Sequence, residues 1–455
     1  MIKREETIAL PNHITAVFAM LDGLELPAWL VGGCLRDLLL GRLPKDWDLT
    51  TPCPPGIVRE RLQGAGVSLW ETGLKHGTLT FRYQGQIYEI TTFRRDGPYL
   101  DHRRPEWVEY TSSLREDLAR RDFTVNAIAW RAGEGIADPF GGLEDMDSRV
   151  IRAVGLPESR LEEDALRILR GVRFAGSLDF TLDAGLASAM RDKRELLRLI
   201  SPERLAAELS AILLLPSPRR ALDLLAEMEL WLYLAPEMTR TVDFDQNSSH
   251  HYLNVYEHMM QTVENTPPIL ELRLAAMLHD IAKPAVISQD EKGKSHYYHH
   301  ETMGAEMASA VLDRLRFSHA VRDWVVLLIK LHMLHLKTPD DAVLRRTISK
   351  LPKPREESLE RVLVLQKADL LASRYTEKSL ERFDEFARRC RDILTSGCPL
   401  DIAELAVKGS ELEELGVAPA KRGDAQKAML AEVLLAPENN NRQRMLEVLE
   451  GFRSL

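Results

Sequence analysis

Two aspartates that lie close together along the sequence are the first candidates for chemistry. Asp46 and Asp48 belong to the stretch LVGGCLRDLLLGRLPKDWDLTT, residues 30–51. Side chains alternate between the faces of a β-strand, so we expect both carboxylates to project together while Trp47 points the other way. Neighbouring carboxylates repel each other unless a cation lies between them, and Mg²⁺ prefers oxygen ligands. The stretch therefore predicts a Mg²⁺ site at these two aspartates.

The residues just before the aspartates are typical of a phosphate-binding turn. Gly32 and Gly33 leave room for backbone N–H groups to approach a phosphate where the next helix begins. Arg36, one turn into that helix, can bring positive charge to the same phosphates. The turn, the arginine and the metal-binding carboxylates together indicate a nucleoside-triphosphate site.

Two regions of different secondary structure must position these residues. The region from residue 26 to about 130 has an α/β pattern, with a hairpin turn predicted at Gln84-Gly85. Its expected strands and helix are PAWLVGG (27–33), the helical CLRDLLLG (34–41), DWDLTT (46–51), TLTFRYQGQIYEITTF (78–93) and FTVNAIAW (123–130). From about residue 158 the apolar spacing is helical, with an expected linker at 236–251 and breaks near 396–401 and 435–441.

The composition excludes several classes of protein. At 455 residues the chain has room for about three domains, and its formal net charge of −9 excludes an overall basic nucleic-acid-binding surface. The four cysteines form no CxxC pair, which indicates reduced thiols. Apolar runs such as residues 325–329 are far shorter than the ~20 residues of a membrane span, and the first residues lack a signal-peptide core. We expect a soluble, cytoplasmic protein with no membrane partner.

Four ordered motifs resemble the class II nucleotidyltransferases of the polymerase-β superfamily, which include tRNA CCA-adding enzymes and bacterial poly(A) polymerases. The first is the stretch that carries the two aspartates. The others are DLARRDFTVNAIAW (117–130), DPFGGLEDMDSRVIRAVG (138–155) and EEDALRILRGVRFA (162–175), and SPERLAAEL (201–209) is similar to the next helical motif. The resemblance covers about the first half of the chain.

The resemblance implies roles for residues of the first two motifs. Asp46 and Asp48 would hold two Mg²⁺ ions, Arg121 would contact the phosphates and Asp122 would lie near the ribose. Two further residues each have two possible roles. Glu89 is either a third metal-binding carboxylate or a surface residue of a strand, and Asn126 is either a nucleotide ligand or a residue that forms structural hydrogen bonds.

A helix that begins the fourth motif is expected to select the base. Asp164, Arg167, Arg170 and Arg173 follow at three-residue steps, so neighbours in the series touch on a helix. An acceptor at Asp164 beside a donor fork at Arg167 matches the pairing edges of cytosine and adenine and rejects uracil and guanine without a template. Arg170 and Arg173 would contact phosphate or support this pair, while Ile168, Val172 and Ala175 line the apolar side.

Histidines are concentrated in the second half, where ten of the thirteen lie between residues 250 and 335. Their pattern resembles the HD superfamily of metal-dependent phosphohydrolases. The resemblance implies a minimal ligand set of His258, His279, Asp280 and Asp369, with His300 and His332 needed for a second ion. Imidazoles with carboxylates suit Ni²⁺, Mn²⁺, Fe or Zn²⁺ better than Mg²⁺. The alternative is a helical domain that keeps this shape without metal.

The two resemblances together imply an α+β head with a mixed β-sheet and helices, followed by an elongated all-α neck, an HD body and a tail. The implied boundaries are 1–150 for the nucleotidyltransferase head, 151–238 for the neck that recognises the base, 239–375 for the HD body and 376–455 for the tail. The segment LAVKGSELEELGVAP (405–419) resembles the tRNA-contacting tail of the family. It continues into APAKRGDAQ, in place of the usual Gly-Pro-rich turn.

The implied function is addition or repair of the 3′-terminal CCA of tRNA from CTP and ATP, with release of pyrophosphate. HD phosphatase or 2′,3′-cyclic phosphodiesterase activity on damaged 3′ ends is implied as a second activity, and the oligomeric state is left open. The relatives that add only A or make poly(A) are alternatives, although the acidic chain lacks a basic tail. A full-length linker at 91–110 argues against a CC-only enzyme. From other classes, an HD phosphohydrolase with a nucleotide-sensing head and a pure RNA-binding module are disfavoured by the aspartate pair.

Overall fold

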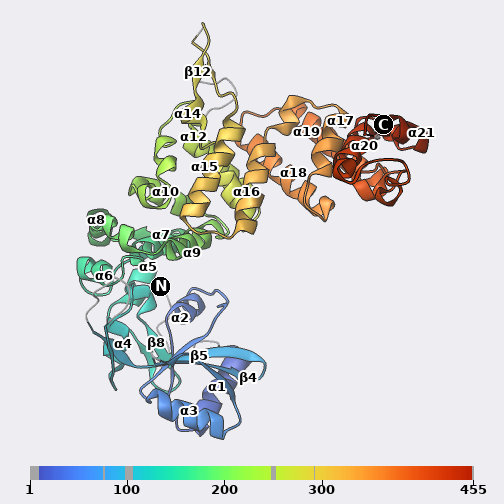
Figure 1. Ribbon diagram of the computed structural model, residues 1–455. Helices are drawn as coiled ribbons and strands as arrows, with labels where there is room; N and C mark the ends of the chain where they lie inside the picture. Colours follow the sequence, from blue (N-terminus) through green and yellow to red (C-terminus); the bar gives the residue numbers. More distant parts are fainter. Residues whose placement is uncertain (1–9, 75–76, 98–105, 247–252, 292, 453–455) are drawn as a thin grey trace. The chain divides into compact units, whose positions relative to one another are not determined.

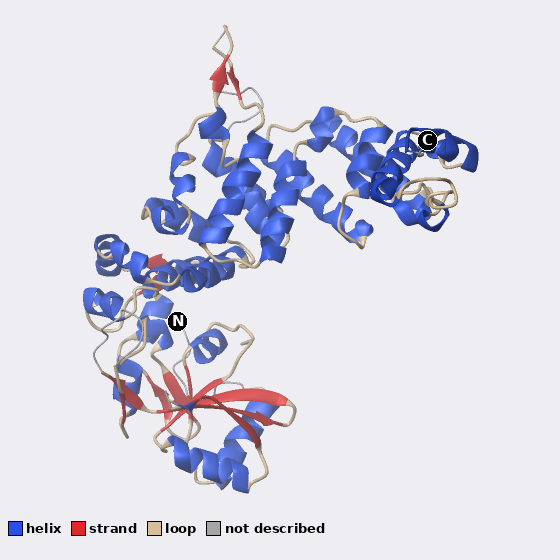
Figure 2. Ribbon diagram, in the orientation of Figure 1, coloured by secondary structure: helices blue, strands red, loops and turns tan. Residues whose placement is uncertain are grey.

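The computed structural model describes residues 10–74, 77–97, 106–246, 253–291 and 293–452 (Figure 1). The chain divides into two compact units, residues 1–236 and 237–455. The first combines a sheet with helices, and the second is almost entirely helical (Figure 2). The predicted α+β architecture with a helical continuation is confirmed.

A seven-stranded mixed sheet organises the N-terminal unit, in the order β3-β4-β5-β2-β1-β8-β9. β2 and β5 are parallel, and the other neighbours are antiparallel. The strands are β1 Trp29–Val31, β2 Asp48–Thr51, β3 Ser68–Gly73, β4 Thr78–Tyr83, β5 Gln86–Thr92, β8 Ala129–Arg131 and β9 Gly135–Ala137. Two small sheets pair β6 Arg94–Asp96 with β7 Val108–Tyr110, and β10 Val150–Ile151 with β11 Thr181–Leu182.

The predicted hairpin is confirmed at β4–β5. Gln84 and Gly85 have φ values of 47° and 80°, and positive φ at both central residues is the requirement of a type I′ turn. The predicted strand FTVNAIAW is wrong in its first half, since Thr124–Asn126 form a 3₁₀ helix. The Thr124 hydroxyl donates to buried Asp145 at 2.6 Å, a tertiary contact that overrides the strand preference of this segment.

The predicted strand at 46–51 is shorter than expected. β2 begins at Asp48, and Asp46 lies in a bend just before it, because the paired register with β5 starts at Asp48. The alternation of faces still holds across the junction. Trp47 is buried with its ring 5.4 Å from that of His13, whereas Asp46 is exposed.

The helices of the N-terminal unit are α1 Asn12–Gly23, α2 Gly33–Leu39, α3 Pro55–Gly64, α4 Leu114–Ala119, α5 Gly142–Asp147, α6 Pro157–Glu163, α7 Arg167–Leu178, α8 Ala184–Asp192, α9 Pro202–Leu213, α10 Arg219–Glu227 and α11 Trp231–Leu234. The predicted helix at 34–41 and the helical pattern after residue 158 are confirmed, whereas α1, α3, α4 and α5 were not predicted. On α7 the predicted apolar residues Ile168, Val172 and Ala175 are fully buried.

The C-terminal unit is built from helices, with one short hairpin of β12 Ser288–Gln289 and β13 Ser295–His296. The helices are α12 Val255–Asn265, α13 Leu270–Leu278, α14 Lys283–Val286, α15 His300–Arg314, α16 His319–Leu331, α17 Asp341–Ser349, α18 Arg355–Ala372, α19 Glu377–Thr395, α20 Arg422–Leu435 and α21 Arg442–Leu449. α19 and α20 end at the two predicted breaks. Within the described residues, no helix is both long and apolar enough to cross a membrane.

Candidate functional site

Two carboxylates project from one face of the sheet in the N-terminal unit, and that of Asp46 lies in the bend just before β2. Glu89 of β5 is the register partner of Asp48, so the two side chains project from the same face. Burial, and then the charge of Asp46, raise the pKa of Asp48 against the opposing effect of Arg121. Burial and the two aspartates likewise raise the pKa of Glu89. A divalent cation would relieve this mutual repulsion, and the role of these carboxylates as Mg²⁺ ligands stays a prediction.

Arg121 brings positive charge to the same place. A Cβ added at Gly32, which has a φ of +77°, would lie 3.0 Å from Arg121 Nη1 and 3.8 Å from Asp48 Oδ2. Only glycine leaves room there without strain. Buried Asp117 accepts a hydrogen bond from Arg121 Nη2 at 3.4 Å and so helps to orient the guanidinium. Sequence reasoning missed Asp117, although it opens the motif at 117–130.

A chain of polar contacts continues from the N-terminal sheet to α7. Arg36 donates to Asn126 at 2.6 Å, and Asn126 donates to Asp122 at 3.0 Å. Asp122 accepts from Nε and Nη2 of Arg170 at 2.9 and 2.6 Å. Although burial raises the pKa of Asp122, Arg170 and Asn126 lower it to about 2. Arg36 and Asp122 are thus engaged by protein side chains, and Asn126 makes structural hydrogen bonds; their roles toward a nucleotide stay predictions.

The prediction that one helix carries Asp164 and Arg167 together is wrong. Asp164 has an extended backbone between α6 and α7, where its side chain accepts a hydrogen bond from the backbone N–H of Leu166 at 3.1 Å, and α7 begins only at Arg167. Each residue also has a separate partner: Asp164 accepts from Arg204 of α9 at 3.0 Å, and Arg167 donates to Glu163 of α6 at 2.6 Å.

Two residues beside this pair were missed by sequence reasoning. Arg204 lies in SPERLAAEL, and its Nη1 is buried with no hydrogen-bond partner among the described residues. Glu163 directly precedes Asp164 in the fourth motif. The pair is therefore a group of two acceptors and two guanidinium donors. Further along α7, Arg173 donates to Glu208 at 2.8 Å, so it is held by α9.

Six residues of the C-terminal unit form two adjoining clusters, all of them buried. His258 Nε2 lies 3.2 Å from His279 Nε2 and 3.0 Å from Asp369 Oδ1. In the second cluster, His300 Nε2 lies 3.2 Å from His332 Nε2 and 3.3 Å from Asp280 Oδ1. The other oxygen of Asp280 faces the first cluster, 3.4 Å from His258 Nε2 and 3.3 Å from His279 Nε2. Asp280 therefore bridges the two.

The positions of these residues explain why the rings face inward. His279 and His332 directly follow α13 and α16, and the Nδ1 of each donates to a carbonyl one turn earlier, Ala276 O at 2.8 Å and Ile329 O at 2.6 Å. Carbonyls in the last turn of a helix often lack an i+4 backbone donor and accept from side chains instead. His300 uses its Nδ1 in the same way, toward Tyr297 O at 2.7 Å. All three rings therefore turn Nε2 toward the cluster. Although burial lowers the pKa of His279, Asp280 and Asp369 raise it above its usual value.

This donor set fits metal ions. The two Nε2 atoms of each histidine pair lie 3.2 Å apart, and ligands about 2.1 Å from a common metal lie roughly 3.0–3.4 Å apart. A proton is a poor substitute in the second cluster, because burial, and then the charge of His279, lower the pKa of His332 to about 3. Burial raises the pKa of Asp280, but Lys283 and His279 more than offset this effect and keep it ionised. The site thus provides imidazole nitrogens and carboxylate oxygens, the ligand types that suit a transition metal.

The clusters open into a cavity of about 560 Å³, referred to below as the metal-site cavity. Asp280, His300, His332 and Asp369 line its floor. Lys283, which the sequence reasoning missed, donates from its wall to Asp280 at 2.6 Å and to Gln246 at 2.8 Å.

Three family models match consecutive parts of the chain. The one described as "Poly A polymerase head domain" matches residues 28–152, and "Probable RNA and SrmB- binding site of polymerase A" matches residues 179–241. The HD domain matches residues 249–374. The first range contains the carboxylates and Arg121, and the third contains all six residues of the two clusters.

Curated and solved relatives point the same way. The CCA-adding enzyme of Listeria monocytogenes is 45% identical over 207 residues, 46% of this chain and 52% of that protein, so the aligned part spans about half of the relative's length. The structure of the Bacillus stearothermophilus CCA-adding enzyme in complex with CTP aligns over 96% of both chains, with 26% identity and a TM-score of 0.68. That of the Thermotoga maritima CCA-adding enzyme complexed with tRNA shares the fold over 99% of this chain and 97% of that one, with a TM-score of 0.60 at 19% identity. The chain therefore matches the head and RNA-binding regions of the poly(A) polymerase models and an HD domain in consecutive segments, and over about half of their length it is similar to CCA-adding enzymes.

Proposed function

We propose that the chain adds C, C and A to the 3′ end of tRNA, taking CTP and ATP and releasing pyrophosphate. The observation that carries the proposal is the grouping of Asp46, Asp48 and Glu89 beside Arg121 and the Gly32 turn. Family members named CCA-adding enzymes, one of them solved with CTP, support the choice of substrate.

Phosphoryl transfer depends mainly on positioning and on neutralising charge. Asp46 and Asp48, with Glu89 beside them, are the residues that would hold two Mg²⁺ ions. When bound, such ions lower the pKa of the attacking 3′-hydroxyl and stabilise the leaving pyrophosphate. Arg121 would bind the triphosphate from the side of the glycine turn, held in orientation by Asp117.

Base selection is assigned to the four residues at the α6–α7 junction. Asp164 and Glu163 offer acceptors, and Arg167 and Arg204 offer donors, within one group. Cytosine and adenine each present an amino donor next to a ring-nitrogen acceptor, the complement of a paired carboxylate and guanidinium. In this proposal an incoming base replaces part of the contacts that these residues make with each other, and Arg204 Nη1 already lacks a partner among the described residues.

A second function is favoured by the two histidine clusters. We infer a phosphohydrolase site, with His258, His279 and Asp369 at one ion, His300 and His332 at the other, and Asp280 between them. A transition metal such as Ni²⁺, Mn²⁺, Fe or Zn²⁺ would supply charge to a phosphate ester and activate water.

The four-part division proposed from the sequence assigns these functions to segments. Residues 1–150 would be the catalytic head, 151–238 the base-selecting neck, 239–375 the HD body and 376–455 a tail that binds tRNA. The linker at 91–110 lies partly outside the described residues. A cytoplasmic location is proposed together with this function.

The test uses the purified full-length chain and three tRNAs, ending before the first C, after CC, and after CCA. With each labelled triphosphate supplied singly and in pairs, we expect CTP to extend the first tRNA by two residues and ATP to extend only the second. Addition of A to all three tRNAs would favour a poly(A) polymerase, and extension by ATP of the second alone, with no use of CTP, an A-adding enzyme. Incorporation of neither nucleotide would favour an HD phosphohydrolase with a nucleotide-sensing head.

A further inference from the structure

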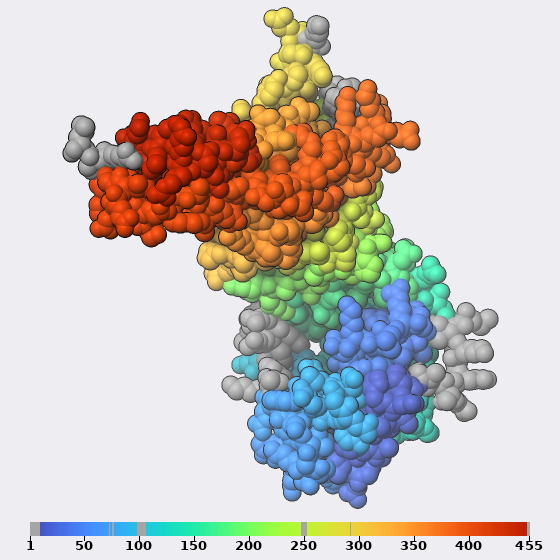
Figure 3. Space-filling view, turned by 90° about the vertical axis from the view of Figure 1, so that its right-hand side faces the viewer, coloured from blue at the N-terminus to red at the C-terminus, as the bar shows by residue number. Residues whose placement is uncertain are grey.

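The metal-site cavity is larger than the metal clusters require. Its volume of about 560 Å³ lies in the range of sites that enclose a small organic ligand. Beyond its floor, the wall includes the β12–β13 hairpin, which projects from the helices of the C-terminal unit (Figures 1 and 3). The lining also includes Ser373 and Arg374, which directly follow α18.

The charged side chains that line the cavity outside the metal clusters are all positive. Apart from Asp280 and Asp369, which belong to the metal clusters, the charged groups that line the cavity are Lys283, Lys294 and Arg374. Lys283 is already engaged by Asp280. The side chains of Lys294 and Arg374 form no ion pair with any residue that the structure describes. In a chain of net charge −9, two uncommitted cations at one cavity indicate an anionic ligand.

The hairpin also brings a flat aromatic surface to the cavity. The rings of His296 and Tyr298 stack with their centroids 5.3 Å apart and their planes 5° from parallel. Asp290 holds His296 in place, 3.1 Å from its Nε2. Tyr298 keeps 67% of its surface exposed. A free aromatic face next to cations is the combination on which nucleobases stack beside their phosphates.

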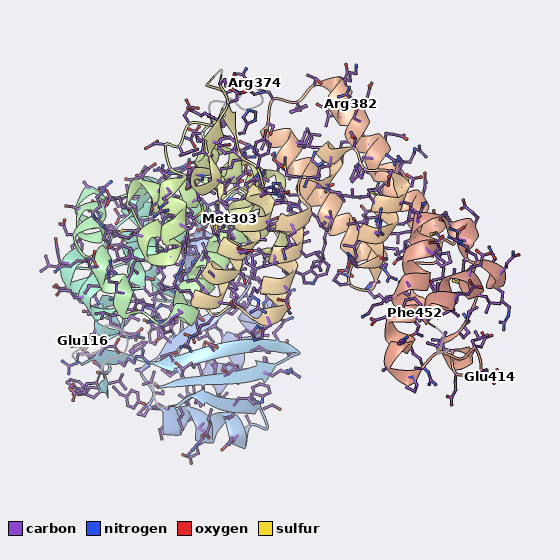
Figure 4. All side chains as sticks on the ribbon, turned by 45° about the horizontal axis from the view of Figure 1, so that its top comes forward. Glu116, Met303, Arg374, Arg382, Glu414 and Phe452 are labelled. Atoms are coloured by element: carbon purple, nitrogen blue, oxygen red, sulfur yellow. The ribbon has the colours of Figure 1, made fainter. Side chains whose placement is uncertain are left out.

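We propose that the metal-site cavity takes a nucleotide with two phosphate groups. One phosphate would lie at the histidine clusters, the second at Arg374 and Lys294, and the base against Tyr298. Arg374 lies beside the hairpin in Figure 4. The inference rests on the proposed phosphohydrolase function and names its substrate class. In hydrolysis, the oxygen of water bonds to phosphorus, the bond from phosphorus to the ribose oxygen breaks, and that oxygen takes a proton from the water.

The two phosphates could come from a free nucleoside bisphosphate or from an RNA end, where an internucleotide phosphate accompanies the terminal one. Both sources share the chemistry that Arg374 and Lys294 recognise. The experiment therefore compares phosphate release from adenosine 3′-phosphate, adenosine 3′,5′-bisphosphate, the dinucleotide ApA with a 3′-phosphate, and ribose 5-phosphate, which has no base. The protein is the full chain loaded with Mn²⁺ or Ni²⁺.

The wild type is expected to prefer the two-phosphate substrates over adenosine 3′-phosphate by about tenfold in kcat/KM, because a charged hydrogen bond is worth about that factor. The Arg374→Ala variant should lose this preference and leave adenosine 3′-phosphate unaffected. The exposed Arg382, outside the cavity lining, is the matched control, and Arg382→Ala should change nothing (Figure 4). A preference for the bisphosphate over the dinucleotide, or the reverse, identifies the source.

The aromatic surface is tested separately. Tyr298→Ala should lower kcat/KM by about tenfold on every adenosine substrate but not on ribose 5-phosphate, whereas Tyr298→Phe should retain the wild-type values. Equal kcat/KM for one and two phosphates, or a preference that survives Arg374→Ala, would overturn the inference. If no substrate is hydrolysed, the phosphohydrolase function itself is wrong. In that case the affinity for adenosine 3′,5′-bisphosphate is measured by calorimetry. Weaker binding by Arg374→Ala than by the wild type would support the inference, and equal affinities would overturn it.

Discussion

The carboxylate site of the N-terminal unit and the histidine clusters of the C-terminal unit are both proposed metal sites for phosphate chemistry, but they offer different metal ligands. The first offers only oxygen atoms, from two adjacent strands and the bend before one of them, with Asp46 and Glu89 exposed. The second adds four imidazoles and is buried. Oxygen ligands at an accessible site suit Mg²⁺ that arrives with a triphosphate, whereas buried imidazoles suit a transition metal that stays bound. In the proposed functions, the identity of the ligands therefore separates two phosphate chemistries.

The strongest way to break this comparison is to remove one oxygen ligand. Asp48→Asn should reduce nucleotide addition at least ~10³-fold, because the lost charge stabilises the transition state by several kcal/mol. Phosphate release at the histidine clusters and tRNA binding should remain. Incorporation assays with labelled CTP measure the effect, and Asp192→Asn, at an exposed aspartate, is the matched control. Addition at the wild-type rate would refute the metal role of Asp48.

The converse change acts on the bridging ligand. Asp280→Asn should weaken metal binding at both clusters by at least ~10²-fold, since Asp280 faces both pairs of histidines. His332→Ala should weaken only one of the two ions. Elemental analysis after dialysis against Mn²⁺ gives the number of ions retained, and nucleotide addition should be unchanged in both variants. Two ions retained by Asp280→Asn would contradict the bridge.

A smaller effect is expected at the α6–α7 junction. Arg167→Ala should blur the choice between correct and incorrect nucleotides by about tenfold while changing tRNA affinity little, because a mismatched buried polar group is what rejects the wrong base. Arg173→Ala is the comparison, since its guanidinium is bound to Glu208 instead. Competition between CTP and UTP measures the selectivity. An unchanged ratio in Arg167→Ala would remove this residue from base selection.

The smallest effect concerns stability and its pH dependence. The pKa of Asp122 is lowered from 3.8 to about 2, so its stabilisation is complete above about pH 4 and is lost as the pH falls toward 2. Asp122→Asn should therefore lower the free energy of unfolding by about 2 kcal/mol at pH 7, and the difference should narrow below pH 4. Denaturant titrations at several pH values measure it, with the exposed Asp179→Asn as control. A difference independent of pH would contradict the ion pair with Arg170.

The sequence predicted the local parts of the fold well. The hairpin at Gln84-Gly85 and the breaks that end α19 and α20 depend on short-range turn and helix signals, and they were found in place. The segment FTVN was wrong because a tertiary hydrogen bond from Thr124 decided its conformation. The same reason applies to Asp164, where the bond to Arg204 of α9 cannot be read from helical periodicity.

The candidate sites divide in the same way. Asp46 and Asp48 are two residues apart in the sequence, so the expected alternation of side chains was enough to predict that they project together. The six residues of the histidine clusters lie on or next to different helices between residues 258 and 369. Only the family resemblance connected them. Asp117, Lys283 and Arg204 were missed because they act through other charged side chains, and the sequence does not show which charges are neighbours.

The most direct test of two distinct metal centres is anomalous scattering from crystals soaked with Mn²⁺ and a non-hydrolysable CTP analogue. We expect a peak between the carboxylates of Asp46 and Asp48 next to the triphosphate, and two peaks on either side of Asp280. Carboxylates splayed apart without a peak, with the analogue bound elsewhere, would contradict the assignment of nucleotide addition to the N-terminal unit.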